Sequence, residues 1–391
     1  MTAFLLAAGD PLFANGVDGG VIAIVILKTV VTFVVLMVSV LFMIWFERKI
    51  IADMQNRIGP NEAGKWGILQ TLADGIKLFF KEDLLPDRAD KRVFRLAPYL
   101  SLTTAFLAFS IVPVGGVVTM FGHRTLLQLA DPQIGILLLL AVSAVAVYGV
   151  MLAGWSSGSK YPLLGSVRAS AQMVSYEAAM GLSVVAVVLI SGSLSTRDIV
   201  DSQAGRFLFD WNIFRLAFVP FVVFLIAVTA ELNRPPFDLV EAEQELVGGF
   251  HTEYSSIRFA LFFLAEFMNT VTMSAIVVTL FLGGPSGPGL DVLPWLWPIL
   301  WFVAKLFLFL FSYVWVRATL PRFRYDQLMD LGWKKLIPLS LFWLLVIAGL
   351  LIKRSYGFAV FGGGLLCALM LFRALEVGRR VSDAETAQGV H

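Results

Sequence analysis

Between residues 231 and 266 the chain concentrates side chains that can carry protons. The stretch holds seven carboxylates but only two arginines, Arg234 and Arg258. It lies between two apolar segments, and carboxylates in or beside a membrane are costly enough to indicate a proton or ion path. The seven acids are Glu231, Asp238, Glu241, Glu243, Glu245, Glu253 and Glu266. This pattern predicts that the protein handles protons.

The composition indicates a membrane protein, because 58% hydrophobic and 15% charged residues are typical of polytopic helical chains. The net charge of +2 gives no indication of a nucleic-acid partner. The single cysteine, Cys367, rules out an intrachain disulfide and a cysteine-bound iron–sulfur cluster or zinc site. The three histidines lie far apart, and no glycine-rich nucleotide loop is present. We therefore expect no metal site on this chain and any redox cofactor on another chain.

Nine apolar runs approach the roughly 20 residues that cross a bilayer as a helix. They predict an all-α polytopic membrane protein with about nine transmembrane helices, eight in the core and one at the C-terminus. Such a chain forms a single integral membrane domain over residues 1–391. The nine runs are 21–46, 97–121, 135–154, 171–192, 214–231, 259–282, 296–316, 337–352 and 356–374.

Basic residues set the predicted orientation of these spans. Most lysines and arginines fall on one side, in the loops 47–96, 155–170, 232–258 and 317–336 and in the tail from 373. Because basic loops stay in the cytoplasm, we predict an outside N-terminus and a cytoplasmic C-terminus. Residues 1–20 contain no lysine or arginine, so we interpret them as a short tail rather than a secretory signal.

The first inner loop contains an amphipathic segment, from Asn61 to Asp83. Its apolar positions recur at helical spacing, whereas Asp74, Lys77 and Lys81 fall on another face. Such a helix lies in the plane of the membrane interface. It is either a linker along the membrane or one wall of an access path for an amphipathic, lipid-soluble substrate. The apolar positions are Trp66, Leu69, Leu72, Ile76, Phe79 and Phe80.

Three carboxylates lie on three predicted spans at a similar depth. Glu177 is six residues into the fourth span and Glu266 seven residues into the sixth, which places both roughly 10 Å below the cytoplasmic surface. Glu231 closes the fifth span on the same side, just before Pro235 and Pro236, which end the helix. We therefore expect these three carboxylates to converge.

The triplet Glu241, Glu243 and Glu245 admits two arrangements. In a helix the first and third share a face, whereas in a strand all three align, and the sequence leaves both open. Acids this close cannot all be ionised in a low dielectric, so we expect coupled titration and some raised pKa values. A solvated acidic loop, paired with nearby basic residues, is the alternative interpretation.

Eight unusual strings follow one another along the chain: ERK at 47–49, RIGPN at 57–61, LADGIKL at 72–78, SYE at 175–177, AELNRPPFD at 230–238, EAEQELV at 241–247, GFHTEY at 249–254 and RFRYDQ at 322–327. Together they resemble one family, the H subunit of bacterial respiratory complex I, the NADH-quinone oxidoreductase. The resemblance covers residues 21–352, and the remainder, residues 353–391, resembles the extra C-terminal span and cytoplasmic tail of longer bacterial forms. It implies a multi-pass protein of the bacterial plasma (inner) membrane.

This resemblance implies a position at the junction of the two arms of complex I. FMN and iron–sulfur clusters are then expected on peripheral-arm partner subunits, and small membrane-arm subunits are expected to adjoin the proton pumps. Ubiquinone or menaquinone, the substrate, is expected to enter from the membrane lipids through a chamber and to be reduced on a peripheral-arm partner. The positions that match the family's quinone chamber are Arg48, Arg57, Asp74, Lys77, Arg234 and Arg317.

The family's acidic path toward the proton pumps matches Glu177 and the seven acids of residues 231–266. The third predicted span, residues 135–154, departs from some members because it contains no carboxylate; a water or a neighbouring subunit is the expected substitute. We hypothesise that quinone reduction changes the charge near the acidic loop and that the resulting pKa shifts propagate along the path.

Two other functions are compatible with parts of this pattern. The membrane subunit of an energy-converting hydrogenase shares the acidic loop, but the strings at 249–254 and 322–327 favour complex I. A stand-alone proton-coupled carrier uses carboxylates as ion sites, but the chain has no inverted repeat and its acids gather on one side.

Overall fold

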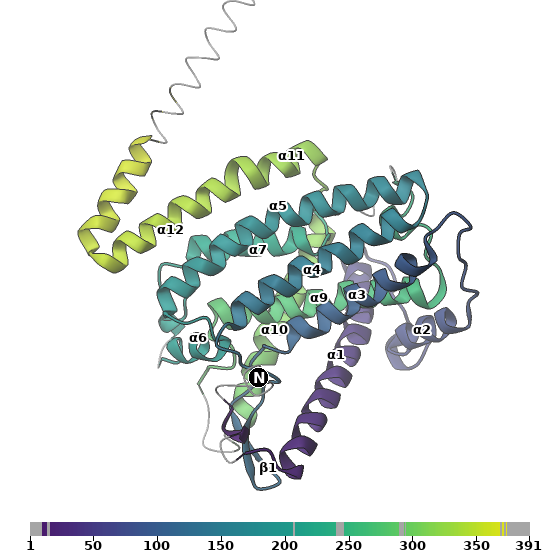
Figure 1. Cartoon of the computed structure of the whole chain (residues 1–391), viewed down its shortest axis with the longest axis horizontal. Coiled ribbons are helices and arrows are strands. Elements are labelled where there is room, and N and C mark those ends of the chain that lie inside the picture. The colour runs from purple at the N-terminus through teal and green to yellow at the C-terminus, as the bar shows by residue number, and fades with distance from the viewer. Residues whose placement is uncertain are drawn as a thin grey trace, which may run out of the picture.

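The computed structural model describes residues 10–13, 16–205, 208–239, 246–288, 293, 295–367, 370 and 373. Most of these residues are helical (Figure 1). The helices are α1 (Gly19–Met54), α2 (Gln70–Phe80), α3 (Lys91–Phe109), α4 (Gly135–Ser156), α5 (Lys160–Ser191), α6 (Thr196–Ser202), α7 (Phe218–Glu231), α9 (Ser256–Phe281), α10 (Leu296–Thr319), α11 (Tyr325–Asp330) and α12 (Ile337–Ile352). The strands are β1 (Val117–Met120) and β2 (His123–Leu126).

Successive long helices run in alternate directions, so the bundle has two ends (Figure 1). We call the end that carries α2 the α2 end, and the end that carries β1 and β2 the hairpin end. Six helical stretches are long and apolar enough to cross a membrane, namely α1, α4, α5, α9, α10 and the continuous stretch Tyr325–Ile352. The prediction of a polytopic helical membrane protein is confirmed.

The second predicted span, 97–121, is wrong at its C-terminal end. Helix α3 begins earlier, at Lys91, and ends at Phe109. Beyond it Pro113 and two glycines interrupt the helix, because proline lacks a backbone donor and glycine favours turns. The chain then forms an antiparallel hairpin in which Val117 pairs with Leu126.

Two further predicted spans differ in length from the helices that are present. The fifth, 214–231, contains α7, which has only 14 residues and is therefore about 21 Å long. The ninth, 356–374, begins within a helical segment at 354–367, and most of its remaining residues lie outside the described ranges. That segment packs back on α12, where a Cβ at Gly357 would meet Leu350.

Helix α9 forms the centre of the bundle. In its most apolar part 72% of residues are buried within the protein, compared with 22% for α1. Helices α3 and α4 approach each other closely at Gly149 of α4, where a Cβ would lie 3.1 Å from the Ser101 nitrogen of α3. Small residues commonly allow such close packing between membrane helices. The exposed apolar surface of α1 is typical of a helix that faces lipid.

Helix α2 begins later than the amphipathic segment predicted from Asn61. Trp66 and Gly67 have φ angles of 60° and 73°, which an α-helix does not tolerate. A Cβ at Gly67 would lie 2.4 Å from the Pro60 carbonyl, so the close approach requires glycine. The indole of Trp45 in α1 donates to the Trp66 carbonyl at 3.0 Å and holds this turn beside α1. The helical amphipathic part is thus confirmed only for Gln70–Phe80.

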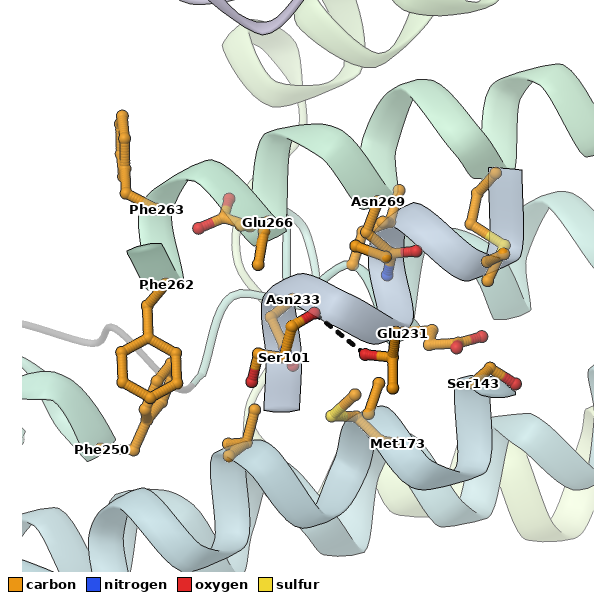
Figure 2. Close-up of a pocket in the computed structure, with 18 of the residues that line it drawn as sticks. Ser101, Ser143, Met173, Glu231, Asn233, Phe250, Phe262, Phe263, Glu266 and Asn269 are labelled. Atoms are coloured by element: carbon orange, nitrogen blue, oxygen red, sulfur yellow. Dashed lines mark hydrogen bonds between the residues drawn. The ribbon is translucent and has the colours of Figure 1, made fainter. Parts of the chain in front are cut away.

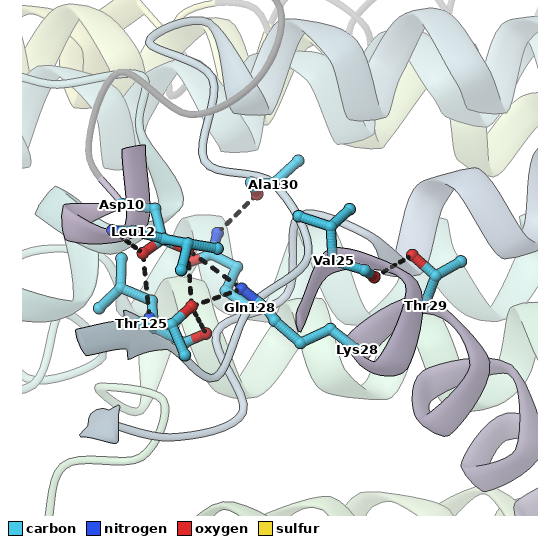
Figure 3. Close-up of polar contacts among 9 residues, drawn as sticks. Asp10, Leu12, Val25, Lys28, Thr29, Thr125, Gln128 and Ala130 are labelled. Atoms are coloured by element: carbon cyan, nitrogen blue, oxygen red, sulfur yellow. Dashed lines mark hydrogen bonds and ion pairs between the residues drawn. The ribbon is translucent and has the colours of Figure 1, made fainter. Parts of the chain in front are cut away.

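A buried ion pair joins three segments at the hairpin end (Figure 3). Lys28 Nζ of α1 lies 3.0 Å from Asp10 Oδ2 and 3.0 Å from Thr125 Oγ1 of β2. The other Asp10 oxygen accepts from the backbone nitrogens of Leu12 and Leu126. Because each charge has several partners, burial of this pair is tolerated.

Candidate functional site

A cavity lined by apolar side chains and several polar ones lies inside the α2 half of the bundle, between α3, α4, α5, α7 and α9 (Figure 2). Its volume is about 90 Å³, which accommodates several waters at roughly 10–15 Å³ each. Figure 2 shows Glu231 between α9, which carries Glu266 and Asn269, and α5, which carries Met173. The polar lining residues are Ser101, Thr104, Ser143, Glu231, Asn233, His251, Glu266 and Asn269.

Glu231 is the last residue of α7 and is buried, with 4% exposure. Its Oε2 has no hydrogen-bond partner among the described residues, although a buried carboxylate normally requires one. The residue also belongs to the lining of the cavity. Glu177 lies near enough for its charge to repel a charge on Glu231. Glu231 and Glu177 are thus brought together.

Glu177 lies deeper along its helix than the sequence indicated. Helix α5 begins at Lys160, eleven residues before the predicted start at residue 171, so the helix extends well beyond the expected surface. Its side chain is half-buried. Next to it, Tyr176 donates to the Leu328 carbonyl at 2.8 Å, and Trp333 donates to Ser175 at 3.0 Å. These contacts fix α5 against α11, which contains Leu328, and against the π-helical stretch Leu331–Leu336, which contains Trp333.

Arg234 connects the cavity with a second buried cluster. Its Nε lies 3.5 Å from Glu266 Oε1, which belongs to the cavity, and its Nη1 lies 2.9 Å from Glu47 Oε2. Its guanidinium also lies 4.4 Å from the ring centre of Phe267, a cation–π distance. The side chain of Arg234 is 3% exposed.

Glu47 is a site residue that the sequence did not single out. It occurs in the string ERK, which by itself resembles the basic end of a membrane span. In the structure its carboxylate is 7% exposed and binds two guanidiniums, those of Arg234 and Arg317. A carboxylate at the end of a long apolar run, where only basic residues are expected, is the signal that could have identified it.

The other residues matched to the quinone chamber lie nearer the surface. Arg48 Nη1 of α1 pairs with Asp74 Oδ2 of α2 at 2.7 Å, and both side chains are more than a third exposed. Lys77 is exposed on α2. Arg57 is exposed and donates to Gln55 at 2.7 Å. The structure therefore divides this set into an inner pair of arginines, at 234 and 317, and an outer group beside α2.

The remaining acids do not all lie at the cavity. Asp238 Oδ2 pairs with Arg322 Nη2 at 3.0 Å, and the Asp238 side chain is 4% exposed. Glu253 lines a separate depression near Arg88 and Lys160. Glu241, Glu243 and Glu245 lie outside the described residues, so their arrangement as helix or strand stays a prediction.

His251 also lines the cavity, and its only signal at the level of sequence was its place in the string GFHTEY. Burial disfavours the charged imidazolium and lowers the pKa of His251 to about 4, against a smaller opposing effect of Asp238. The ring is neutral at pH 7 and can both donate and accept. Nearby, Tyr254 stacks on Phe94 at 3.9 Å, and burial raises the pKa of its hydroxyl to about 12.

The cavity wall formed by α4 contains no carboxylate, as expected for residues 135–154. The polar group there is the hydroxyl of Ser143, which donates to the Leu140 carbonyl at 3.0 Å. A hydroxyl can hold a water but cannot store a proton at neutral pH. Within the described ranges no three His, Cys, Asp or Glu side chains are close enough to bind a metal ion.

The fold is that of a multi-pass helical membrane protein, and two carboxylates, those of Glu231 and Glu266, belong to the lining of its internal cavity. The family model described as NADH dehydrogenase matches residues 27–348. The NADH-quinone oxidoreductase H subunit of Frankia alni is 58% identical over 83% of this chain and 72% of its own length. The H subunit of Frankia casuarinae is 53% identical over 89% of this chain and 79% of its own length. The H subunit of Streptomyces avermitilis is 50% identical over 93% of this chain and 82% of its own length. The chain belongs to the family of NADH-quinone oxidoreductase H subunits, which contribute a membrane component to respiratory complex I.

Proposed function

We propose that this protein forms the access chamber for quinone and couples quinone reduction to proton translocation through buried carboxylates. The observation that carries the proposal is the position of Arg234, which contacts Glu47 at 2.9 Å and the cavity residue Glu266 at 3.5 Å. One guanidinium therefore belongs to both sites. We call Glu47, Arg234 and Arg317 the Glu47 cluster. A change of charge in this cluster acts on the cavity through the side chain of Arg234.

The access path lies beside α1 and α2. The apolar face of α2 is exposed, with Phe79 71% and Phe80 88% accessible, as expected of a helix in the membrane interface. Arg48 and Asp74 join the two helices. A quinone has an apolar tail and a polar head, so this surface suits the tail, and the arginines at 234 and 317 suit the oxygens of the head.

The proton path starts at the cavity. Glu231 and Glu266 face it, Glu177 lies near Glu231, and waters that fill it can carry a proton between side chains. We assign Asp238, Glu241, Glu243, Glu245 and Glu253 to the same path, on the cytoplasmic side. Across α4, which lacks a carboxylate, a water held by Ser143 or a neighbouring subunit completes it.

The coupling is electrostatic. Arrival or loss of one charge at the Glu47 cluster alters the proton affinity of carboxylates in a poorly solvated cavity. Each pKa unit corresponds to about 1.4 kcal/mol, so a change of a few units suffices to move a proton. In this proposal the flavin and iron–sulfur clusters lie on peripheral-arm partners, and the α2 end faces the cytoplasm.

The relatives favour this function over the two alternatives. All three are named as the H subunit of NADH-quinone oxidoreductase and match at least 83% of this chain, whereas a hydrogenase subunit would share mainly the acidic loop.

The test replaces Glu231 by Gln in the native membrane. We expect NADH oxidation with a short-chain quinone, and the proton uptake coupled to it, to fall about tenfold or more, as for the loss of a proton-transfer group. Oxidation with ferricyanide, which needs only the peripheral arm, is expected to be unchanged. Glu62→Gln makes the same chemical change at an exposed position and serves as the control. Full quinone activity in the Glu231 variant would remove the proposed coupling role.

A further inference from the structure

The side chain of Gln172 lies where α5 passes the turn that follows α7. It is 1% exposed. Its Nε2 lies 2.7 Å from the Ala230 carbonyl, 2.9 Å from the Phe237 carbonyl and 3.2 Å from Asn233 Oδ1. All three partners accept hydrogen bonds, so the NH₂ group of the amide faces the turn. This side chain has no role in the proton path proposed above.

These contacts connect the two sides of one turn. Ala230 belongs to the last turn of α7, and its carbonyl also accepts from the Asn233 nitrogen at 3.2 Å. Phe237 follows Pro235 and Pro236, neither of which has a backbone donor. Asn233, which lies between Ala230 and Phe237, has a φ of 52°. This is a left-handed conformation that asparagine tolerates better than most residues. The Phe237 carbonyl also accepts from the Leu239 nitrogen at 3.0 Å. Gln172 therefore adds to these local bonds a side-chain donor from another helix that reaches both sides of the turn.

The same turn carries two side chains of the proposed mechanism. Glu231 follows Ala230 and faces the cavity, whereas Arg234 follows Asn233 and contacts Glu47. A shift of the turn would therefore move the carboxylate and the guanidinium together. Gln172 holds this turn against α5, the helix that also carries Glu177.

We propose that Gln172 is a positioning residue for proton coupling. By donating to both sides of the turn it fixes Glu231 relative to Glu177 and Arg234 relative to Glu47. This inference rests on the function proposed above. It predicts that loss of the amide donor uncouples the two sites although every charged group remains.

The test compares Gln172→Met with a matched buried control, in the complete complex in its membrane. Gln203 is 0% exposed and donates to the Ile199 and Thr279 carbonyls, but it lies at the hairpin end. Both substitutions remove a buried amide and keep its length. We expect Gln172→Met to lower quinone turnover per assembled complex about tenfold, the equivalent of one hydrogen bond. Gln203→Met is expected to leave that turnover unchanged.

A second variant adds a readout that a purely structural role would not change. In Gln172→Glu the carboxyl group can donate to the Ala230 or Phe237 carbonyl only when protonated. Its quinone turnover, divided by that of the native complex at each pH, is expected to rise several-fold as the pH falls from about 8.5 to about 6. The same ratio for Gln172→Met is expected to stay flat. If the Met variant does not assemble, the pH profile of the Glu variant is the test.

Three results would overturn the assignment: full turnover in Gln172→Met, equal pH profiles for the two variants, or failure of both to assemble. Glu231→Gln, measured in parallel, separates this inference from the function beneath it. If that variant keeps full turnover, the proposed proton path itself fails. If it loses turnover while Gln172→Met retains it, the role of Gln172 alone is excluded.

Discussion

Arg234 Nη1 lies 2.9 Å from Glu47 Oε2, and both side chains are more than nine-tenths buried. Glu47 belongs to the first long helix, and Arg234 to the turn after α7, 187 residues later. The second oxygen of Glu47 accepts from Arg317. The carboxylate thus joins three parts of the chain. Together with Glu266, which lies 3.5 Å from Arg234 Nε, it gives two carboxylates for the two guanidiniums.

Removal of this negative charge is expected to impair quinone binding. Glu47→Gln removes the negative charge beside the buried Arg234 and the partly exposed Arg317, and breaking a buried ion pair costs about 3–5 kcal/mol. We expect a higher KM for a short-chain quinone and a lower Tm of the purified complex. Steady-state kinetics and thermal unfolding measure these quantities.

Asp53→Asn makes the matched change on the same helix, where the side chain is exposed. This control is expected to behave as the native complex does. A Glu47→Gln complex with native KM and native Tm would contradict a role for the buried pair.

The ion pair between Asp238 and Arg322 is expected to fix the segment after α7 to the loop before α11. The carboxylate is 4% and the guanidinium 48% exposed. We expect Arg322→Gln alone to destabilise the complex, because it leaves a buried charge without this partner. Adding Asp238→Asn is expected to recover part of that loss.

A double-mutant cycle on the Tm of the complex measures this coupling, which we expect to be about 1–3 kcal/mol. The backbone bond from the Phe323 nitrogen to the Pro236 carbonyl, at 3.0 Å, remains in all variants. Strictly additive effects would show that the two side chains act independently.

His251 is expected to make the complex sensitive to acid. Its pKa is about 4 in the folded protein because of burial, compared with about 6.5 when unfolded. As the pH falls from about 6.5 to about 4, the unfolded chain gains this proton first, so stability is full above the window and is lost within it. His251→Gln is expected to reduce this loss.

The Tm of the complex measured between pH 7.5 and pH 4.5 tests this expectation. The upper limit lies about one unit above the ordinary pKa of histidine, and the lower limit lies about half a unit above the pKa of His251 in the folded protein. His123→Gln removes an imidazole from β2, at the opposite end, and is the control. Parallel acid curves for native and His251→Gln complexes would assign the sensitivity to other groups.

Most of the helices could be predicted from hydrophobic runs, but their ends could not. The apolar run after residue 97 continues past Phe109, yet the helix stops there and a hairpin follows. An apolar strand and an apolar helix have similar composition, and Pro113 was the available signal. In the opposite direction, α5 starts at Lys160, because a membrane helix can continue into water where its residues are polar.

The site was predictable where charge is rare. A carboxylate in an apolar run is conspicuous, and Glu231 and Glu266 do line the same cavity. Glu47 and Gln172 were not identified, since one lies in a charged string and the other is an uncharged residue in a long helix. Their positions depend on contacts with residues far away in sequence, which no local pattern reveals.

The contact of Lys28 with Asp10 and Thr125 has a consequence for biogenesis. Asp10 precedes Lys28 by 18 residues, but Thr125 follows it by 97. At about 5–20 residues per second, synthesis of that interval takes roughly 5–20 s. During this time the first helix carries a lysine whose ammonium can pair with Asp10 but not yet with Thr125. In the orientation that the basic loops predict, with the N-terminus outside, Asp10 crosses the membrane with the first helix and neutralises the nascent span before the hairpin exists to complete its surroundings.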